Sequence, residues 1–259
     1  MKLEKLLFKS IFKTKGFIAL RNTFNFRPIM MSTEGLEFSS VSDAFMWRTD
    51  NNFKTIFNFS DIFDIFFKIK KSYVKINFFS KNNIFIKSME IRELKLSNQI
   101  IISSEFLNNI KDYGTFYIHH YTDKIFSKNT VISNRCYLGY SQNSNLYSFV
   151  HGNSLTKYER FDGDSKKNIN IVKSSLIKNQ TYKIQKYFDN FDKSELFITN
   201  PTTNTIKFSI EGANYKLEKG CSKIIDISNL KIISIKSNCM FFRPTVFCYK
   251  DKYLDVHHC

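Results

Sequence analysis

Ser133-Asn134-Arg135-Cys136-Tyr137-Leu138-Gly139-Tyr140 is the stretch of sequence around which the fold prediction is built, and it closes at Leu146-Tyr147-Ser148-Phe149-Val150-His151. A second version ends the chain, as Ser237-Asn238-Cys239-Met240-Phe241-Phe242-Arg243-Pro244 closing at Tyr253-Leu254-Asp255-Val256-His257-His258. The Ser-Asn pair precedes Val-His by 17 residues in the first copy and by 19 in the second. The two copies therefore differ by one small loop change, and we expect a duplicated β unit.

The internal match extends upstream of both stretches. Leu94-Lys95-Leu96 followed by Ile100-Ile101-Ile102-Ser103 parallels Tyr215-Lys216-Leu217 followed by Ile224-Ile225-Asp226-Ile227-Ser228. Each pair consists of an apolar-Lys-Leu segment, a polar link and an isoleucine-rich strand. A repeat with a period of about 100 residues has the size of a β-sandwich domain rather than of a solenoid unit.

Period-two alternation of apolar residues supplies the other strand predictions. It is clear in Tyr73–Phe79 and resumes in Ile84–Lys87 after a turn, which predicts a β-hairpin. Further candidate strands, separated by short polar links, are Leu94–Leu96, Ile100–Ser103, Gly114–His120, Leu196–Thr199 and Ile206–Ile210. Residues 61–67 fit either a strand or one amphipathic helical turn. The predicted class is all-β, with two antiparallel β-sandwich domains, Ig-like or jelly-roll-like.

These patterns divide the chain into four regions. Residues 1–35 are expected to hold a short basic helix and a linker, and residues 36–152 the first sandwich. Residues 153–195 are polar and irregular, most of all at Asp162–Lys167, so we expect a linker there. Residues 196–259 are predicted to form the second sandwich.

Residues 1–13 have an amphipathic pattern. Leu3, Leu6, Leu7 and Ile11 recur at helical spacing, with lysines between them. Such a segment suits peripheral contact with an anionic membrane or packing against a protein surface. Packing is favoured, because a helix this short is marginal in water unless its apolar face is covered.

Composition limits the partners of the chain. Of its 259 residues 42% are apolar and 16% aromatic, which excludes disorder for most of the length. Its net charge of +16 suits binding to nucleic acid, anionic lipid or acidic glycans. Base-stacking sheets interleave aromatic with basic residues, and Phe116-Tyr117-Ile118 has the rings but no local basic pattern, which disfavours nucleic acid. The five cysteines contain no Cys-x-x-Cys pair, which indicates reduced thiols in a cytoplasmic protein.

The histidines fall near the ends of predicted strands, at His119, His120, His151, His257 and His258. Strand ends on one rim of a sandwich can converge, so His119, His151 and His257 together with Asp255 are candidate ligands for Zn or Fe. Their spacing matches no established metal motif, and a histidine at a strand end is more often a surface or interface residue.

The only tryptophan lies in a segment rich in charge, and Asp43, Trp47, Arg48 and Asp50 form a candidate sugar site. Trp47 would stack on a pyranose, Arg48 would bind a carboxylate, and the two aspartates would accept hydroxyl bonds. The competing interpretation is a core tryptophan next to a structural Arg–Asp pair.

No sequence motif identifies a reaction. Phosphate-binding glycine loops are absent, and Gly139-Tyr140-Ser141-Gln142-Asn143 lacks the second glycine of a nucleophile elbow. The favoured function is a non-catalytic binding or assembly module, without a cofactor, whose ligand is a carbohydrate, such as a surface glycan, or another protein. The alternative is a metal-dependent enzyme that uses the strand-end histidines on a sugar or small acid.

Overall fold

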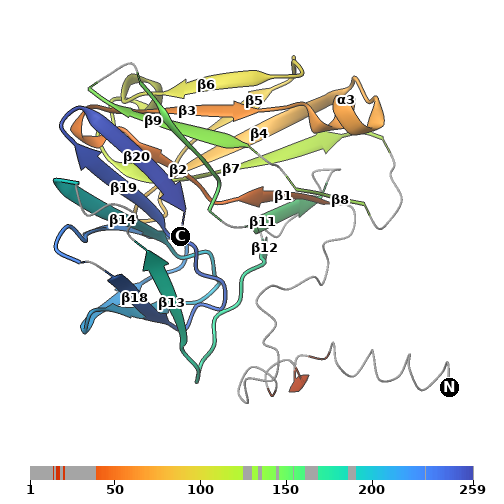
Figure 1. Ribbon diagram of the computed structural model, residues 1–259. Helices are drawn as coiled ribbons and strands as arrows, with labels where there is room; N and C mark the ends of the chain where they lie inside the picture. The colour runs from red at the N-terminus through yellow and green to blue at the C-terminus, as the bar shows by residue number, and fades with distance from the viewer. Residues whose placement is uncertain are drawn as a thin grey trace.

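The structure is a computed structural model that describes residues 39–124, 130–133, 136–143, 146–153, 155–160, 169–185, 191–230 and 232–258, together with residues 14, 16, 17 and 20. The described strands form five four-stranded sheets, which confirms the all-β class (Figure 1). The expected helix of residues 1–13 lies outside the described residues. Within the described part of the chain, no helix has the length and apolarity needed to span a membrane.

The first half of the chain forms two facing antiparallel sheets. One has the order β2-β7-β4-β5 and the other β10-β9-β3-β6. Their strands are β2 (Phe45–Arg48), β3 (Phe53–Phe59), β4 (Ser72–Ser80), β5 (Phe85–Ile91), β6 (Asn98–Ile102), β7 (Tyr113–Thr122), β9 (Tyr137–Gln142) and β10 (Ser148–His151). We call these strands the first half.

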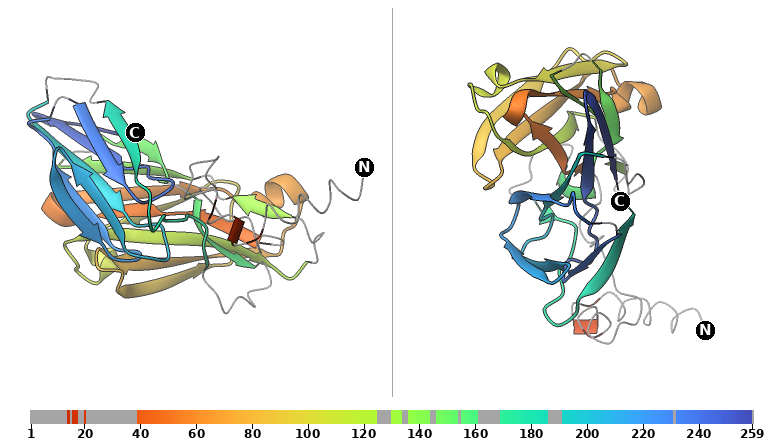
Figure 2. Two further views of the ribbon diagram at one scale, coloured as in Figure 1. Left: turned by 90° about the horizontal axis from the view of Figure 1, so that it is seen from below. Right: turned by 60° about the vertical axis from the view of Figure 1, so that its left-hand side comes forward.

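The second half repeats this arrangement beside the first (Figure 2). Its sheets have the orders β13-β18-β15-β16 and β20-β19-β14-β17. Their strands are β13 (Gln180–Gln185), β14 (Lys193–Thr199), β15 (Ile206–Ile210), β16 (Ala213–Leu217), β17 (Ser222–Asp226), β18 (Ile232–Ser237), β19 (Thr245–Lys250) and β20 (Tyr253–His258).

The two halves share one strand order. Taken along the chain, β2 to β7 followed by β9 and β10 correspond one by one to β13 to β20, and every pairing in one half has its counterpart in the other. The isoleucine-rich strands that matched in the sequence, β6 and β17, occupy the same edge position. A duplicated unit would give this shared strand order, and the duplication itself stays a prediction.

A fifth sheet corrects the expected linker. It has the order β12-β11-β1-β8, from β1 (Ser39–Asp43), β8 (Val131–Ser133), β11 (Leu155–Arg160) and β12 (Ile169–Asn170). β11 pairs antiparallel with β1. Residues 153–195 were expected to be irregular, yet they contain β11, β12, β13 and the start of β14. Local composition did not predict these strands, because β11 pairs with β1 and β13 pairs with β18, and both partners are distant in the sequence.

Other local predictions have mixed outcomes. The hairpin of β4 and β5 is confirmed by antiparallel pairing from Val74↔Ile91 to Phe79↔Phe85. The strand expected at residues 94–96 is wrong, because these residues have no regular secondary structure and Leu94 packs against the core instead. Residues 62–67 form the helix α3 (Ile62–Phe67), which begins where the Asp61 side chain accepts a hydrogen bond from the Asp64 N–H.

The largest buried cluster joins the two halves. It contains Phe53, Phe57 and Tyr140 of the first half together with Phe197 and Phe247 of the second. The ring centroids of Tyr140 and Phe247 lie 5.0 Å apart, an edge-on contact of the kind that stabilises aromatic cores. A second cluster belongs to the second half alone. The halves are therefore fused through one core.

The edge strands β10 and β20, equivalent by strand order, lie against each other at this junction (Figure 1). The Val256 N–H donates to the Ser148 hydroxyl at 2.9 Å, and the His258 Nε2 lies 2.6 Å from the His151 carbonyl oxygen. The contact covers both edges, which would otherwise present unpaired backbone groups.

Phe247→Ala should destabilise the whole chain. It removes a fully buried ring from the shared core, and we expect a loss of about 3–5 kcal/mol in the free energy of unfolding. Trp47, in the same cluster, reports on the first half. Denaturant unfolding followed by Trp47 fluorescence measures the loss. Tyr253→Ala, which truncates a 60% exposed ring, should change the free energy by no more than about 0.5 kcal/mol. A Trp47 transition unaffected by Phe247→Ala would contradict the shared core.

Candidate functional site

Trp47 is a core residue. It has no exposed surface, and its indole N–H donates to the Phe79 carbonyl oxygen at 2.9 Å. β7 approaches so closely that a Cβ added at Gly114 would lie 2.9 Å from the indole. This burial corrects the expected stacking on a sugar, because neither face of the ring is open to a ligand.

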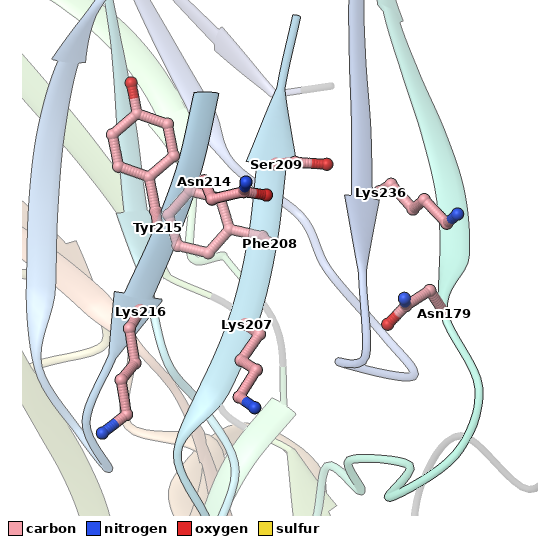
Figure 3. Close-up of a pocket in the computed structure, with 8 residues that line it drawn as sticks. All are labelled: Asn179, Lys207, Phe208, Ser209, Asn214, Tyr215, Lys216 and Lys236. Carbon is pink, nitrogen blue, oxygen red and sulfur yellow. The ribbon is translucent and has the colours of Figure 1, made fainter. Parts of the chain in front are cut away.

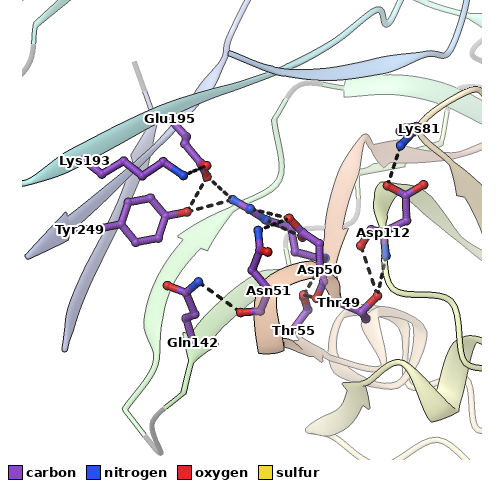
Figure 4. Close-up of polar contacts among 11 residues, drawn as sticks. Thr49, Asp50, Asn51, Thr55, Lys81, Asp112, Gln142, Lys193, Glu195 and Tyr249 are labelled. Carbon is purple, nitrogen blue, oxygen red and sulfur yellow. Dashed lines mark hydrogen bonds and ion pairs between the residues drawn. The ribbon is translucent and has the colours of Figure 1, made fainter. Parts of the chain in front are cut away.

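Arg48 lies at the junction of the two halves, and only 1% of it is exposed. Figure 4 labels its hydrogen-bond partners Asp50, Glu195 and Tyr249. Its Nε and Nη2 donate to both carboxylate oxygens of Asp50, at 3.0 and 2.8 Å. Its Nη1 donates across the junction to Glu195 Oε2 at 2.8 Å and to the Tyr249 hydroxyl at 3.0 Å. We call these four residues the Arg48 cluster.

Aromatic rings cover the guanidinium of Arg48. Its Cζ lies 4.1 Å from the ring centroid of Phe53 and 4.9 Å from that of Phe247. Burial by itself lowers the pKa of Arg48, but the hydrogen bond to Asp50 and the charges around it raise that pKa overall. A buried guanidinium with its donors occupied by protein groups has little left to offer a ligand. The Arg48 cluster therefore links the two halves and does not form a sugar site.

Asp43 lies apart from this cluster, at the end of β1. Its carboxylate packs against Gly152, where an added Cβ would lie 2.5 Å from Asp43 Oδ2. Of the four residues predicted to form the sugar site, the structure joins Arg48 to Asp50 and places Trp47 in the core and Asp43 on a different sheet.

Two of the five histidines are buried along β7 rather than at an open strand end. His119 Nδ1 lies 3.3 Å from the Ser40 carbonyl oxygen, and His120 Nε2 lies 3.2 Å from that of Ser60. Burial lowers the pKa of His119 to about 3, so its imidazole is neutral near pH 7.

The other predicted metal ligands do not converge with His119. His257 Nδ1 lies 3.1 Å from Asp255 Oδ2, and the His151 ring packs on Tyr137 with centroids 4.4 Å apart. Among the residues that the structure describes, no group of three or more His, Cys, Asp or Glu side chains could hold a metal ion. The structure pairs His257 with Asp255 and leaves His119 and His151 at separate places.

A buried polar cluster between β7 and β11 was missed from the sequence. The Tyr121 hydroxyl donates to Glu159, whose Oε1 lies 3.9 Å from His119 Nε2. Lys157 Nζ lies 3.9 Å from the ring centroid of Tyr117. Burial raises the pKa of Glu159 to about 7 and lowers that of Lys157 to about 8. These groups fill the space between two sheets, so they hold β11 on β7.

An open groove of about 530 Å³ lies on the sheet β13-β18-β15-β16 (Figure 3). Alternation along β15 turns Ile206, Phe208 and Ile210 to the core and leaves Lys207 exposed on the opposite face. The groove is lined by Asn179, Lys207, Phe208, Ser209, Asn214, Tyr215, Lys216 and Lys236.

Strand register arranges the outward groups of this sheet in rows. Lys216 lies opposite Lys207, and the next row runs from Asn214 to Ser209 and on to Lys236. Thr181 of β13 extends that row, and Lys183 lies on the same face two residues further along β13. We call the face that carries Lys183, Lys207, Lys216 and Lys236 the lysine face.

The lysine face has unbalanced positive charge. Directly opposed like charges on neighbouring strands destabilise a sheet, and Lys207 and Lys216 are such a pair. Lys216 forms an ion pair with Glu218 at 3.1 Å, and both side chains are largely exposed. Within the described residues, no ion pair joins a carboxylate to Lys207 or Lys236. Each strand of this sheet carries a lysine at an outward position, which is visible in the sequence. Only the order and register of the strands show that these lysines lie on one face.

Arg48→Met should cost far more stability than Lys193→Met, although both remove a cation from the Glu195 carboxylate. We expect a loss of about 3–5 kcal/mol for Arg48→Met, because it leaves a buried carboxylate without its main cation. Lys193→Met should lower the free energy of unfolding by at most about 1 kcal/mol, because half of the Lys193 side chain is exposed. Urea denaturation measures both values. Equal losses would show that the buried Arg48–Glu195 pair contributes no more to the free energy of unfolding than the Lys193–Glu195 pair does.

Glu195→Gln should flatten the acid dependence of stability. Burial by itself raises the pKa of Glu195, but the charge of Arg48 and hydrogen bonds from Lys193, Tyr249 and Arg48 lower it to about 2. Because this value is below the ordinary 4.5, the stabilisation is complete above pH 4.5 and is lost as the pH falls towards 2. Unfolding free energies across that interval test this, and an unchanged slope in Glu195→Gln would contradict it.

Comparisons with known proteins give only remote likenesses. No family model matches the sequence, and no curated protein matches it. The α-L-rhamnosidase of Streptomyces avermitilis, solved with L-rhamnose, has a TM-score of 0.24 and 8% identity over 88% of this chain, which spans 29% of that enzyme. The mannose 6-phosphate isomerase of Bacillus subtilis has a TM-score of 0.23 and 8% identity, over 78% of this chain and 70% of the isomerase. Likenesses at these TM-scores carry no inference about ligand or reaction.

Proposed function

We propose that the chain is a non-catalytic binding module whose lysine face takes an anionic carbohydrate. The observation that carries the proposal is the opposed pair of Lys207 and Lys216 beside Lys236, in a groove where Lys207 and Lys236 have no carboxylate partner among the described residues. A bound sulfate or carboxylate would offset the repulsion between these ammonium groups.

The spacing of the lysine face suits a chain of sugars. Neighbouring strands lie about 4.8 Å apart, and alternate residues on one strand about 7 Å apart, which is the scale of a monosaccharide. Lysines can bind the acidic substituents, while Ser209, Asn214 and Asn179 can exchange hydrogen bonds with hydroxyl groups. The face thus combines the two kinds of group that an acidic glycan needs.

The lining of the groove favours binding over catalysis. It consists of lysines, amides, a hydroxyl and two aromatic residues, Phe208 and Tyr215, which stack with centroids 5.1 Å apart. A hydrolase would need a pair of carboxylates or an activated nucleophile, and the described lining residues supply neither. The groove is also open, as binding sheets for polymers are.

Replacing two groove lysines should abolish binding of an acidic glycan. For Lys207→Gln/Lys236→Gln we expect at least a tenfold loss of affinity, because each charge-assisted hydrogen bond is worth about 1.5–3 kcal/mol. Isothermal titration calorimetry with a sulfated and a polyuronic oligosaccharide measures it, and a neutral oligosaccharide of the same length should not bind.

The matched control is Lys54→Gln/Lys95→Gln, which makes the same charge change at exposed sites in the first half. It should keep the wild-type affinity. An equal loss in the control would reduce the effect to net charge, and equal binding of single-stranded DNA would point to a nucleic-acid partner. Binding of neither glycan, with retention of a protein partner on the same face, would favour an assembly role.

A further inference from the structure

The helix α3 leaves large apolar side chains exposed. Asp64 is its only polar residue, and of its side chains only that of Phe63 is buried. Phe66 is 72% exposed, Phe67 41% and Ile65 37%. A helix that is apolar on all sides is normally enclosed by protein or lipid. We call Ile65, Phe66 and Phe67 the α3 tip.

The α3 tip is held in a fixed shape. The Asp61 side chain caps the first turn, and the Lys68 N–H bonds to the Asp64 and Phe63 carbonyl oxygens at the other end. Beneath the helix, Phe63 and Ile69 form a small core with Ile132. The exposed rings therefore sit on an anchored turn, so presenting them to a partner costs little additional ordering.

Exposed lysines directly follow the apolar residues. Lys68, Lys70 and Lys71 are all exposed. Lys70 forms an ion pair with Asp64 at 3.4 Å. Among the described residues, no carboxylate forms an ion pair with Lys68 or Lys71. Within the described part of the chain, the Lys68 ammonium donates only to the Ile65 carbonyl oxygen, at 3.4 Å. Aromatic residues next to lysines that have no carboxylate partner are the composition by which proteins bind anionic lipid surfaces, because the rings enter the interface and the ammonium groups meet the headgroups.

The position of α3 allows such contact. It connects β3 of one sheet to β4 of the other, so it caps one end of the first sandwich. Figures 1 and 2 show it at the end of the first half away from the strands of the second half. We propose that the α3 tip, with Lys68 and Lys71, is a docking site for an anionic membrane surface, separate from the lysine face.

The protein supplies a matched control at the other end of the same strand. Ile84, in the turn after β4, is 64% exposed, and Phe85, the first residue of β5, is 56% exposed. The nearby Lys81 is already paired with Asp112 at 3.1 Å. These two residues have an apolar exposure similar to that of the α3 tip, but the lysine beside them has a carboxylate partner, so they should not bind anionic lipid.

Vesicle flotation tests the proposal, with phosphatidylcholine vesicles that contain or lack phosphatidylserine. We expect the wild-type chain to float with the phosphatidylserine vesicles only. Phe66→Ser should lower its partition coefficient about tenfold, as should Lys68→Gln/Lys71→Gln, because ring burial and charge attraction each contribute to binding. Phe85→Ser should bind as the wild type does. Unchanged Trp47 fluorescence establishes that each variant is folded.

Three outcomes would overturn the proposal. One is absence of wild-type flotation with either vesicle, and another is an equal loss in Phe85→Ser. The third is a wild-type dimer in sedimentation that Phe66→Ser dissolves, which would make a second copy the occupant of the tip. Lys207→Gln/Lys236→Gln should float as the wild type does, so failure of the glycan proposal and failure of this one are distinguishable.

Discussion

The buried guanidinium of Arg48 is the constraint on which the arrangement of the two halves depends. A charge removed from water costs several kcal/mol unless its surroundings compensate it, and here the compensation comes from both halves. Asp50 belongs to the first half, while Glu195 and Tyr249 belong to the second. Separating the halves would leave Glu195 without the arginine and Arg48 with Asp50 alone. The junction is therefore specified by charge as well as by the apolar core around it.

The same strand order gives the two halves different surfaces because only one of them is covered. In the first half, β11 lies over the outward face of β7, where Lys157 packs on Tyr117 and Glu159 receives the Tyr121 hydroxyl. β18 is the equivalent of β7 by strand order, and nothing comparable to β11 is described over its outward Lys236. The added sheet closes one sandwich face, and its absence from the described part of the second half leaves the lysine face open.

The sequence predicts what depends on local pattern and misses what depends on distant partners. The hairpin of β4 and β5 was predictable, because apolar residues alternate along β4, whose every second residue is buried up to Phe78, and a polar turn separates it from β5. β11 was not, since its partner β1 lies more than a hundred residues earlier in the chain.

The candidate site shows the same limit. The pairing of Arg48 with Asp50 follows from neighbouring positions, but the partner that explains Arg48, Glu195, is 147 residues away. Burial of Trp47 likewise depends on β4 and β7 packing around it. For the lysine face, each lysine is visible in the sequence, yet their convergence requires the register of β15, β16 and β18.

The Arg48 cluster makes the junction between the two halves asymmetric. The strands β3 and β14 are equivalent by strand order, and each contributes a residue that contacts Arg48, Thr55 from β3 and Glu195 from β14. Both converge on Arg48: Thr55 bonds its backbone N–H at 3.0 Å, and Glu195 bonds its guanidinium. A symmetric junction would need two arginines and would fit two copies of either half equally well. With one arginine, only a first half and a second half satisfy the buried charges of the Arg48 cluster, which favours the pairing of unlike halves.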